Sequence, residues 1–214
     1  MLSLTLLSKI CYIVLILFTL FSIYTKYVLK KDFAKYFVLS SLCFLVGIYL
    51  IHQRYQISDF FSIVVANSII CLGEIYLYLA TKNLLGYKNS WKFRYLVPIA
   101  IVFLGFAIFT YIYYDISMRT LIFGTYICFY NGAISWFFYN KKNSFNILNK
   151  ISAIIFFLGC LIFVIFTISS LFINLSSSYF GNKSFIMYIP YLCLLLFLFW
   201  LMFIISLYSK GRSK

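Results

Sequence analysis

The chain has 214 residues, of which 64% are hydrophobic and only 10% are charged. Water-soluble domains contain roughly 45–50% apolar and about 25% charged residues, so this composition excludes an ordinary soluble fold. The net charge of +14 does not indicate a nucleic-acid-binding protein, because the lysines and arginines stand in short clusters between apolar runs rather than on one basic face.

Seven apolar runs follow one another along the chain. A helix needs roughly 20 apolar residues to cross a bilayer, and the runs cover residues 4–24, 36–51, 60–80, 95–113, 120–139, 151–173 and 185–208. The second run is the shortest. None alternates apolar and polar residues as a barrel strand does. We therefore predict an all-α integral membrane protein, a bundle of about seven transmembrane helices that forms one domain over residues 1–214, with no soluble domain.

The basic residues predict the orientation of this bundle, because short loops rich in Lys and Arg stay in the cytoplasm. The first, third and fifth loops and the C-terminal tail hold 14 of the 18 Lys and Arg residues; the other four are Lys9, Arg54, Arg119 and Lys183. The N-terminus is thus expected outside and the C-terminus in the cytoplasm. Abundant Phe, Ile, Tyr, Lys and Asn hint at an AT-rich bacterial genome, so we expect a multi-pass protein of the bacterial cytoplasmic membrane.

Three polar residues inside the runs need an explanation. Glu74 lies in the third run, about six residues from its cytoplasmic end, and an ionisable group there normally faces the bundle interior and has a partner. Asn67 precedes it by seven residues, almost two helical turns, so the two share a face, with Gly73 allowing close helix approach. Asn131 of the fifth run could reach the same interior. The functional interpretation is an ion or proton relay or a switch; the alternative is a hydrogen-bonded carboxyl and two amides that hold helices together.

A second polar group is expected at the outer side. Arg54 and Asp59 lie in the second loop, and Asp115 and Arg119 lie in the fourth, with tyrosines nearby. A cup of arginines and aromatic rings suits a small anion or an apolar carboxylate. The alternative is a solvated rim in which Arg119 pairs with Asp115 or Asp59.

The sequence contains no recognisable catalytic or metal-binding motif. Six cysteines stand singly, and His52 is the only histidine, too few for a metal site or a Ser-His-acid triad. We predict no catalytic residues, no metal and no cofactor, and the sequence favours a non-enzymatic role.

Two stretches resemble a known family. VVANSIICLGEIYLYLATKNLLGYK, with Asn67, Gly73 and Gly86, and ISMRTLIFGTYICFYNGAISWFFYN, with Arg119, look like the multi-helix membrane sensor region that precedes bacterial diguanylate cyclase (GGDEF) domains. The resemblance implies short-looped helices that deliver an output to the cytoplasm, with Asn67, Gly73 and Arg119 as structural or sensing positions. The chain ends at SLYSKGRSK without a GGDEF domain, so it implies no cyclase activity.

Three functions follow as hypotheses. The first is a sensor-like or accessory membrane protein that binds a small ligand or responds to the membrane and passes the change to a cytoplasmic signalling partner. The second is a small transporter or proton-coupled carrier that uses Glu74. The third is a membrane-embedded lipid enzyme. The expected surroundings are the lipid bilayer and no nucleic acid; the sequence predicts no oligomeric state.

Overall fold

The structure of the protein, a computed structural model, describes residues 4–87, 93–141, 145–172 and 189–211. These residues are almost entirely helical, and they contain no β-strand. Helices are expected here, because a helix satisfies its own backbone hydrogen bonds where no water is present to do so. The all-α prediction is confirmed for this part of the chain.

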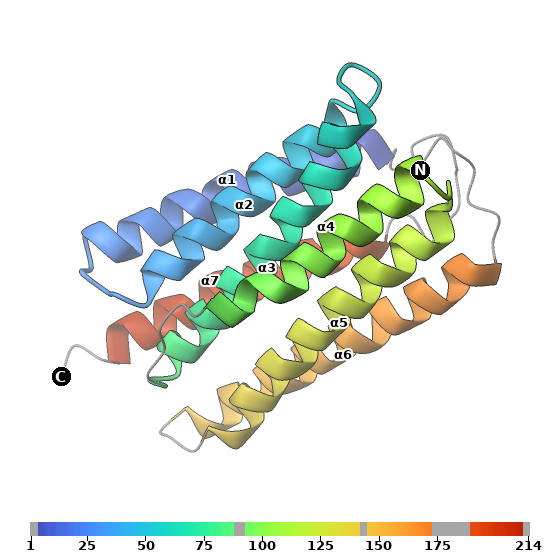
Figure 1. Ribbon diagram of the computed structural model, residues 1–214. Coiled ribbons are helices and arrows are strands. Elements are labelled where there is room, and N and C mark those ends of the chain that lie inside the picture. The colour runs from blue at the N-terminus through green and yellow to red at the C-terminus, as the bar shows by residue number, and fades with distance from the viewer. Residues whose placement is uncertain (1–3, 88–92, 142–144, 173–188, 212–214) are drawn as a thin grey trace.

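Helices occur at each of the seven apolar runs (Figure 1). They are α1 (Leu4–Tyr27), α2 (Ala34–His52), α3 (Ala66–Leu84), α4 (Leu96–Tyr111), α5 (Ile116–Asn140), α6 (Asn146–Phe172) and α7 (Ile189–Gly211). Two shorter segments extend them at their N-terminal ends: a π-helix, η1 (Phe60–Val65), runs directly into α3, and a 3₁₀ turn, η2 (Phe93–Tyr95), runs into α4.

Six of the described helical segments are long and apolar enough to cross a membrane: Lys9–Tyr27, Ala34–His52, Phe60–Leu84, Ile116–Asn140, Asn146–Phe172 and Leu192–Ser209. Helix α4 is shorter, at 16 residues. Large apolar side chains such as Ile101, Phe129 and Ile165 are more than half exposed on the outside of the bundle, where water would be an unfavourable solvent. The chain is therefore built as a multi-pass helical membrane protein.

The helix ends differ from the predicted runs where polar residues begin or extend a helix. Helix α5 starts at Ile116 rather than at residue 120, because the carboxylate of Asp115 accepts a hydrogen bond from the backbone N–H of Met118 (3.0 Å) and caps the helix. Helix α6 starts at Asn146 rather than at residue 151, so its first turn is partly polar. Of the predicted runs, residues 173 and 185–188 lie outside the described part.

Most of the described helices form a closed ring, and the chain reverses direction from each helix to the next. Helix α1 packs against α2 and α7, and the ring continues through α3, α5 and α6 back to α7. Helix α4 packs across α3, α5 and η1.

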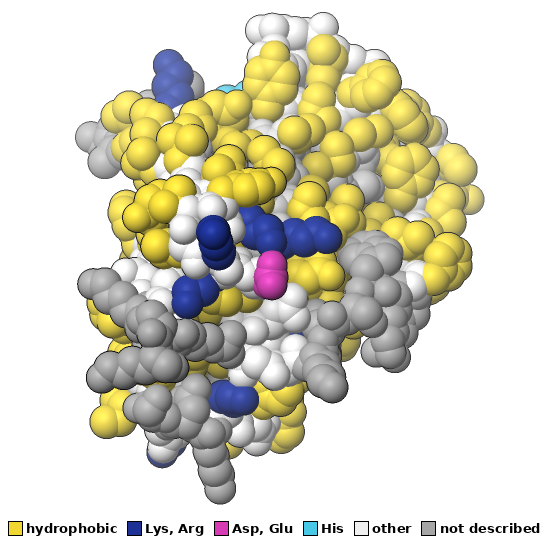
Figure 2. Space-filling model, turned by 90° about the vertical axis from the view of Figure 1, so that its left-hand side faces the viewer, with side chains coloured by type: hydrophobic (Ala, Val, Ile, Leu, Met, Phe, Trp, Pro, Cys, Tyr) yellow, Lys and Arg dark blue, Asp and Glu magenta, His cyan; other side chains and the backbone are white. Residues whose placement is uncertain are grey.

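Lysines gather at one end of this ring, where α1, α3, α5 and α7 all finish (Figure 1). The described members are Lys26, Lys30, Lys31, Lys35, Lys82, Lys141 and Lys150, and Figure 2, which views that end, shows basic side chains on it. Lys26 Nζ lies 2.7 Å from Asp32 Oδ1, and this bond holds the pKa of the exposed Asp32 carboxyl below its usual range. The basic loops, which alternate with less basic ones along the sequence, therefore lie together at one end of the folded bundle.

Hydrogen bonds and small residues join neighbouring helices. Tyr126 Oη on α5 donates to the Cys71 carbonyl on α3 (2.9 Å), and Ser40 Oγ on α2 donates to the Gly73 carbonyl on α3 (2.9 Å). At Gly159 on α6, the absence of a Cβ leaves room for the ring of Phe197 on α7. Such contacts, rather than a hydrophobic driving force, hold helices together in lipid.

We expect Gly159→Ala to destabilise the bundle. The added Cβ would overlap the Phe197 ring, which stacks on Phe156 with 5.1 Å between ring centroids, and overpacking of this kind costs about 1–3 kcal/mol. The measurement is the apparent melting temperature of the purified protein in detergent.

Gly132→Ala is the matched control, because nothing lies within 4 Å of a Cβ at that position. Its melting temperature should stay the same or rise, since Ala is the better helix former. Equal effects of the two substitutions would contradict the close α6–α7 contact.

Candidate functional site

A cavity of about 200 Å³ lies between the helices. Its described lining comes from η1 and from every α-helix except α1, together with Arg54 of the α2–α3 loop. Much of the wall is aromatic and consists of Phe44, Phe106, Phe123, Phe163, Phe166 and Phe197. A mostly apolar pocket with a few polar groups is the usual form of a small-molecule site.

Arg119 lies at one end of the cavity and is 95% buried, with 5% of its surface exposed. The Asp115 cap starts α5 and so places Arg119 in its first turn. Its Nη1 donates to Thr110 Oγ1 (3.3 Å), and its guanidinium carbon lies 5.0 Å from the centre of the Tyr114 ring. Both partners are neutral, so neither of them compensates the charge of the arginine.

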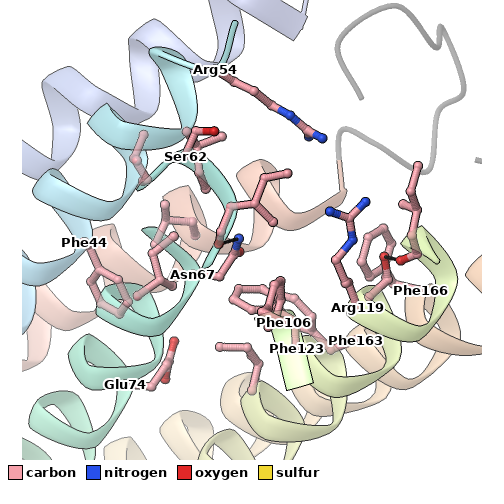
Figure 3. A pocket seen from close by; sticks show the side chains of 18 of the residues that line it. Phe44, Arg54, Ser62, Asn67, Glu74, Phe106, Arg119, Phe123, Phe163 and Phe166 are labelled. Atoms are coloured by element: carbon pink, nitrogen blue, oxygen red, sulfur yellow. Dashed lines mark hydrogen bonds between the residues drawn. The ribbon is translucent and has the colours of Figure 1, made fainter. Parts of the chain in front are cut away.

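Arg54 lies across the opening from Arg119. Figure 3 shows both side chains directed toward the same gap from opposite sides. The guanidinium of Arg54 lies 5.9 Å from the centre of the Tyr55 ring. Among the described residues, neither arginine has a carboxylate oxygen within 4.0 Å. The two guanidinium groups therefore form a basic mouth to an aromatic cavity.

The two outer carboxylates lie apart from the cavity wall. Asp115 uses its side chain to cap α5. Asp59 precedes η1 without capping it and is close enough to attract the charge of Arg119, while Arg54 repels it. Neither aspartate lines the cavity, so the expected pairing of Arg119 with Asp115 or Asp59 does not occur in the described structure.

Asn67 lies on the cavity wall where the π-helix η1 becomes α3. Its Nδ2 donates to the Ile63 carbonyl (2.6 Å), four residues earlier within η1. Ser62 and Ile63 of η1 also line the cavity. Single π-helical turns inside α-helices are frequent at functional sites, and here the turn brings its residues onto the cavity wall.

Glu74 and Asn131 also line the cavity, deeper in the bundle (Figure 3 labels Glu74). Glu74 is 8% exposed and Asn131 is 1% exposed. The Asn131 Nδ2 donates to the Ile127 carbonyl (3.0 Å), but Asn131 Oδ1 and Glu74 Oε2 have no hydrogen-bond partner among the described residues. Two buried acceptor oxygens therefore stand without donors.

The structure brings together two groups of polar residues that the sequence suggested were separate. Arg54 and Arg119 from the expected outer cup line the same cavity as Asn67, Glu74 and Asn131 from the expected interior face. The aromatic wall was not predicted. The sequence does carry a signal for the cavity-facing side of α5, because Thr120, Phe123, Ile127 and Asn131 recur every three or four residues and all line the cavity.

Among the described residues, no three His, Cys, Asp or Glu side chains are grouped so that they could hold a metal ion. Comparisons with protein-family models, with curated proteins and with solved structures gave no match to the chain. The cavity itself is therefore the basis for an assignment of function.

Proposed function

We propose that this chain is a sensor-like protein of the bacterial cytoplasmic membrane with seven spans, which binds a small amphipathic anion in the cavity and passes the change to a cytoplasmic partner. The observation that carries the proposal is the basic mouth, Arg54 and Arg119 without a described acidic partner, on an aromatic cavity. The ligand's anionic group binds the two guanidiniums, and its apolar part fills the cavity.

Helix α4 supplies the seventh span. Although it has only 16 residues, it continues from the three residues of η2. At 1.5 Å per α-helical and 2.0 Å per 3₁₀ residue, the combined segment is about 30 Å long, the thickness of a bilayer core. With seven spans, the lysine-rich end faces the cytoplasm and the basic mouth faces outside.

The charges at the mouth favour an anion. A buried guanidinium without a counter-ion is unfavourable, and its planar set of N–H donors matches carboxylate or phosphate oxygens. Asp59 reduces the positive charge at the mouth only in part, since one carboxylate cannot balance the charges of two arginines. An apolar chain attached to the anion is favoured by the six phenylalanines of the wall.

The position of the cavity couples binding to helix packing. Arg54 follows α2, Arg119 lies on α5, and the wall includes residues of α6 and α7. A ligand that contacts these elements stabilises one arrangement of the helices over others. Since α5 and α7 finish at the lysine-rich end, a partner there would experience the shift. The resemblance of the stretches around Asn67 and Arg119 to membrane sensor regions supports the same role.

We expect the protein in nanodiscs to bind decanoate, and Arg119→Gln to weaken that binding about tenfold or more, because a charge-assisted hydrogen bond is lost. Isothermal titration gives the two dissociation constants. Empty nanodiscs provide the correction for partitioning of decanoate into lipid.

Lys35→Gln is the control, since it removes one positive charge at the exposed lysine-rich end. Its dissociation constant should agree with wild type within about twofold, as expected for a screened surface charge. Wild-type protein that takes up no more decanoate than empty nanodiscs would rule out the proposed ligand class.

A proton-coupled carrier is the second candidate, and the observation that favours it is Glu74, a buried carboxyl on the cavity wall with one oxygen unpartnered. Ionisable residues inside membrane spans often mark ion and proton pathways. No observation among the described residues favours a lipid enzyme.

If the protein is a carrier, Glu74→Gln will abolish proton-driven uptake of decanoate into proteoliposomes, because an amide, unlike a carboxyl group, does not titrate near neutral pH. Asp32→Asn, the same change in the exposed first loop, should leave uptake intact. Uptake that persists in Glu74→Gln, or that is absent from wild-type proteoliposomes, would exclude this mechanism.

A further inference from the structure

The inner end of the cavity has two hydrogen-bond acceptors that lack donors. Glu74 Oε2 and Asn131 Oδ1 are both buried, both belong to cavity-lining residues, and neither has a partner among the described residues. Asn131 is held in place by its bond to the Ile127 carbonyl. A buried acceptor without a donor is unfavourable, so a donor from outside the chain would stabilise this end.

An ammonium group fits these acceptors better than a neutral donor does. It carries several N–H donors, enough for both oxygens, and a positive charge that compensates an ionised Glu74. The rings of Phe44 and Phe123 line the same cavity, and aromatic faces attract an organic cation. The inner end is therefore complementary to a primary amine in its protonated form.

The two ends of the cavity are separated along parallel helices. The bond from Tyr126 to the Cys71 carbonyl places these residues at similar heights on α5 and α3. Arg119 lies seven residues before Tyr126, and Glu74 lies three residues beyond Cys71. At 1.5 Å per residue, the two levels are about 15 Å apart. The cavity thus has cations at its mouth and acceptors about three helical turns deeper.

This order of charges selects against simpler ligands. A free amine would have to pass two guanidinium groups that repel it, and a simple anion leaves Glu74 and Asn131 without a donor. We propose that the ligand is a linear zwitterion, with its anionic group on Arg54 and Arg119 and its ammonium group on Glu74 and Asn131. The inference rests on the anion binding proposed above and adds the second end of the ligand.

The test compares ω-aminodecanoate with decanoate on the protein in nanodiscs, by isothermal titration with empty nanodiscs as the blank. These probes differ only in the terminal amine. Wild type should bind ω-aminodecanoate about tenfold or more tightly than decanoate, since the amine adds hydrogen bonds to a charged group. Decylamine, which lacks the anion, should bind more weakly than either.

The preference should depend on the inner end alone. Glu74→Gln and Asn131→Leu should each reduce the ratio of the two dissociation constants to near one. Two variants are used so that a folding defect in one does not remove the test. Asp32→Asn, the matched change of a carboxylate to an amide outside the spans, should keep the wild-type ratio, and Arg119→Gln should weaken both probes together.

The outcomes separate this inference from the proposed function. Equal binding of the two probes by wild type, or a preference that survives in both inner-end variants, overturns the zwitterion and leaves anion binding standing. If wild type binds neither decanoate nor ω-aminodecanoate, both proposals are overturned.

Discussion

The absence of water in the bilayer core is the constraint on which this structure depends. It requires each backbone polar group to be satisfied within a helix, and it makes every buried side-chain charge or acceptor expensive unless it has a partner. Most polar groups in the spans meet this requirement locally, as Ser68 does by donating to the Val64 carbonyl, or between helices, as Tyr126 does with Cys71. The buried hydroxyls of Ser22, Thr81 and Thr167 have no described partner either, but they do not line the cavity. The arginines without carboxylate partners and the unpartnered oxygens of Glu74 and Asn131 differ because they all line one cavity.

The lysines and the arginines occupy different parts of the bundle. The lysine-rich end holds the one ion pair found in the described chain, between Lys26 and Asp32. The arginines differ from those lysines because Arg119 is buried and both point into a cavity (Figure 3). In the proposed function, positive charge thus has two roles in one chain: the lysines orient the bundle in the membrane, and the arginines bind an anion.

Sequence reasoning predicted the helices and the polar residues but not how they meet. Apolar runs identify helices reliably because the same side chains must face lipid, whereas helix ends depend on local bonds such as the Asp115 cap, which moved the start of α5 by four residues. The π-helical turn before α3 left no recognisable pattern in FFSIVV. Asn67 and Glu74 were placed on a shared face by their spacing, but their union with Arg54 and Arg119 depends on the packing of α3 against α5, which no local pattern reveals.

The central claim is that the basic mouth and the lysine-rich end lie on opposite sides of the membrane, with the mouth outside. Labelling of single introduced cysteines with a membrane-impermeant maleimide in intact cells tests it directly. Gln56→Cys, exposed beside the mouth, should react in cells that have not been permeabilised. Lys35→Cys, exposed at the other end, should react only after the cells have been permeabilised. Labelling of Lys35→Cys in intact cells while Gln56→Cys stays protected would contradict the account.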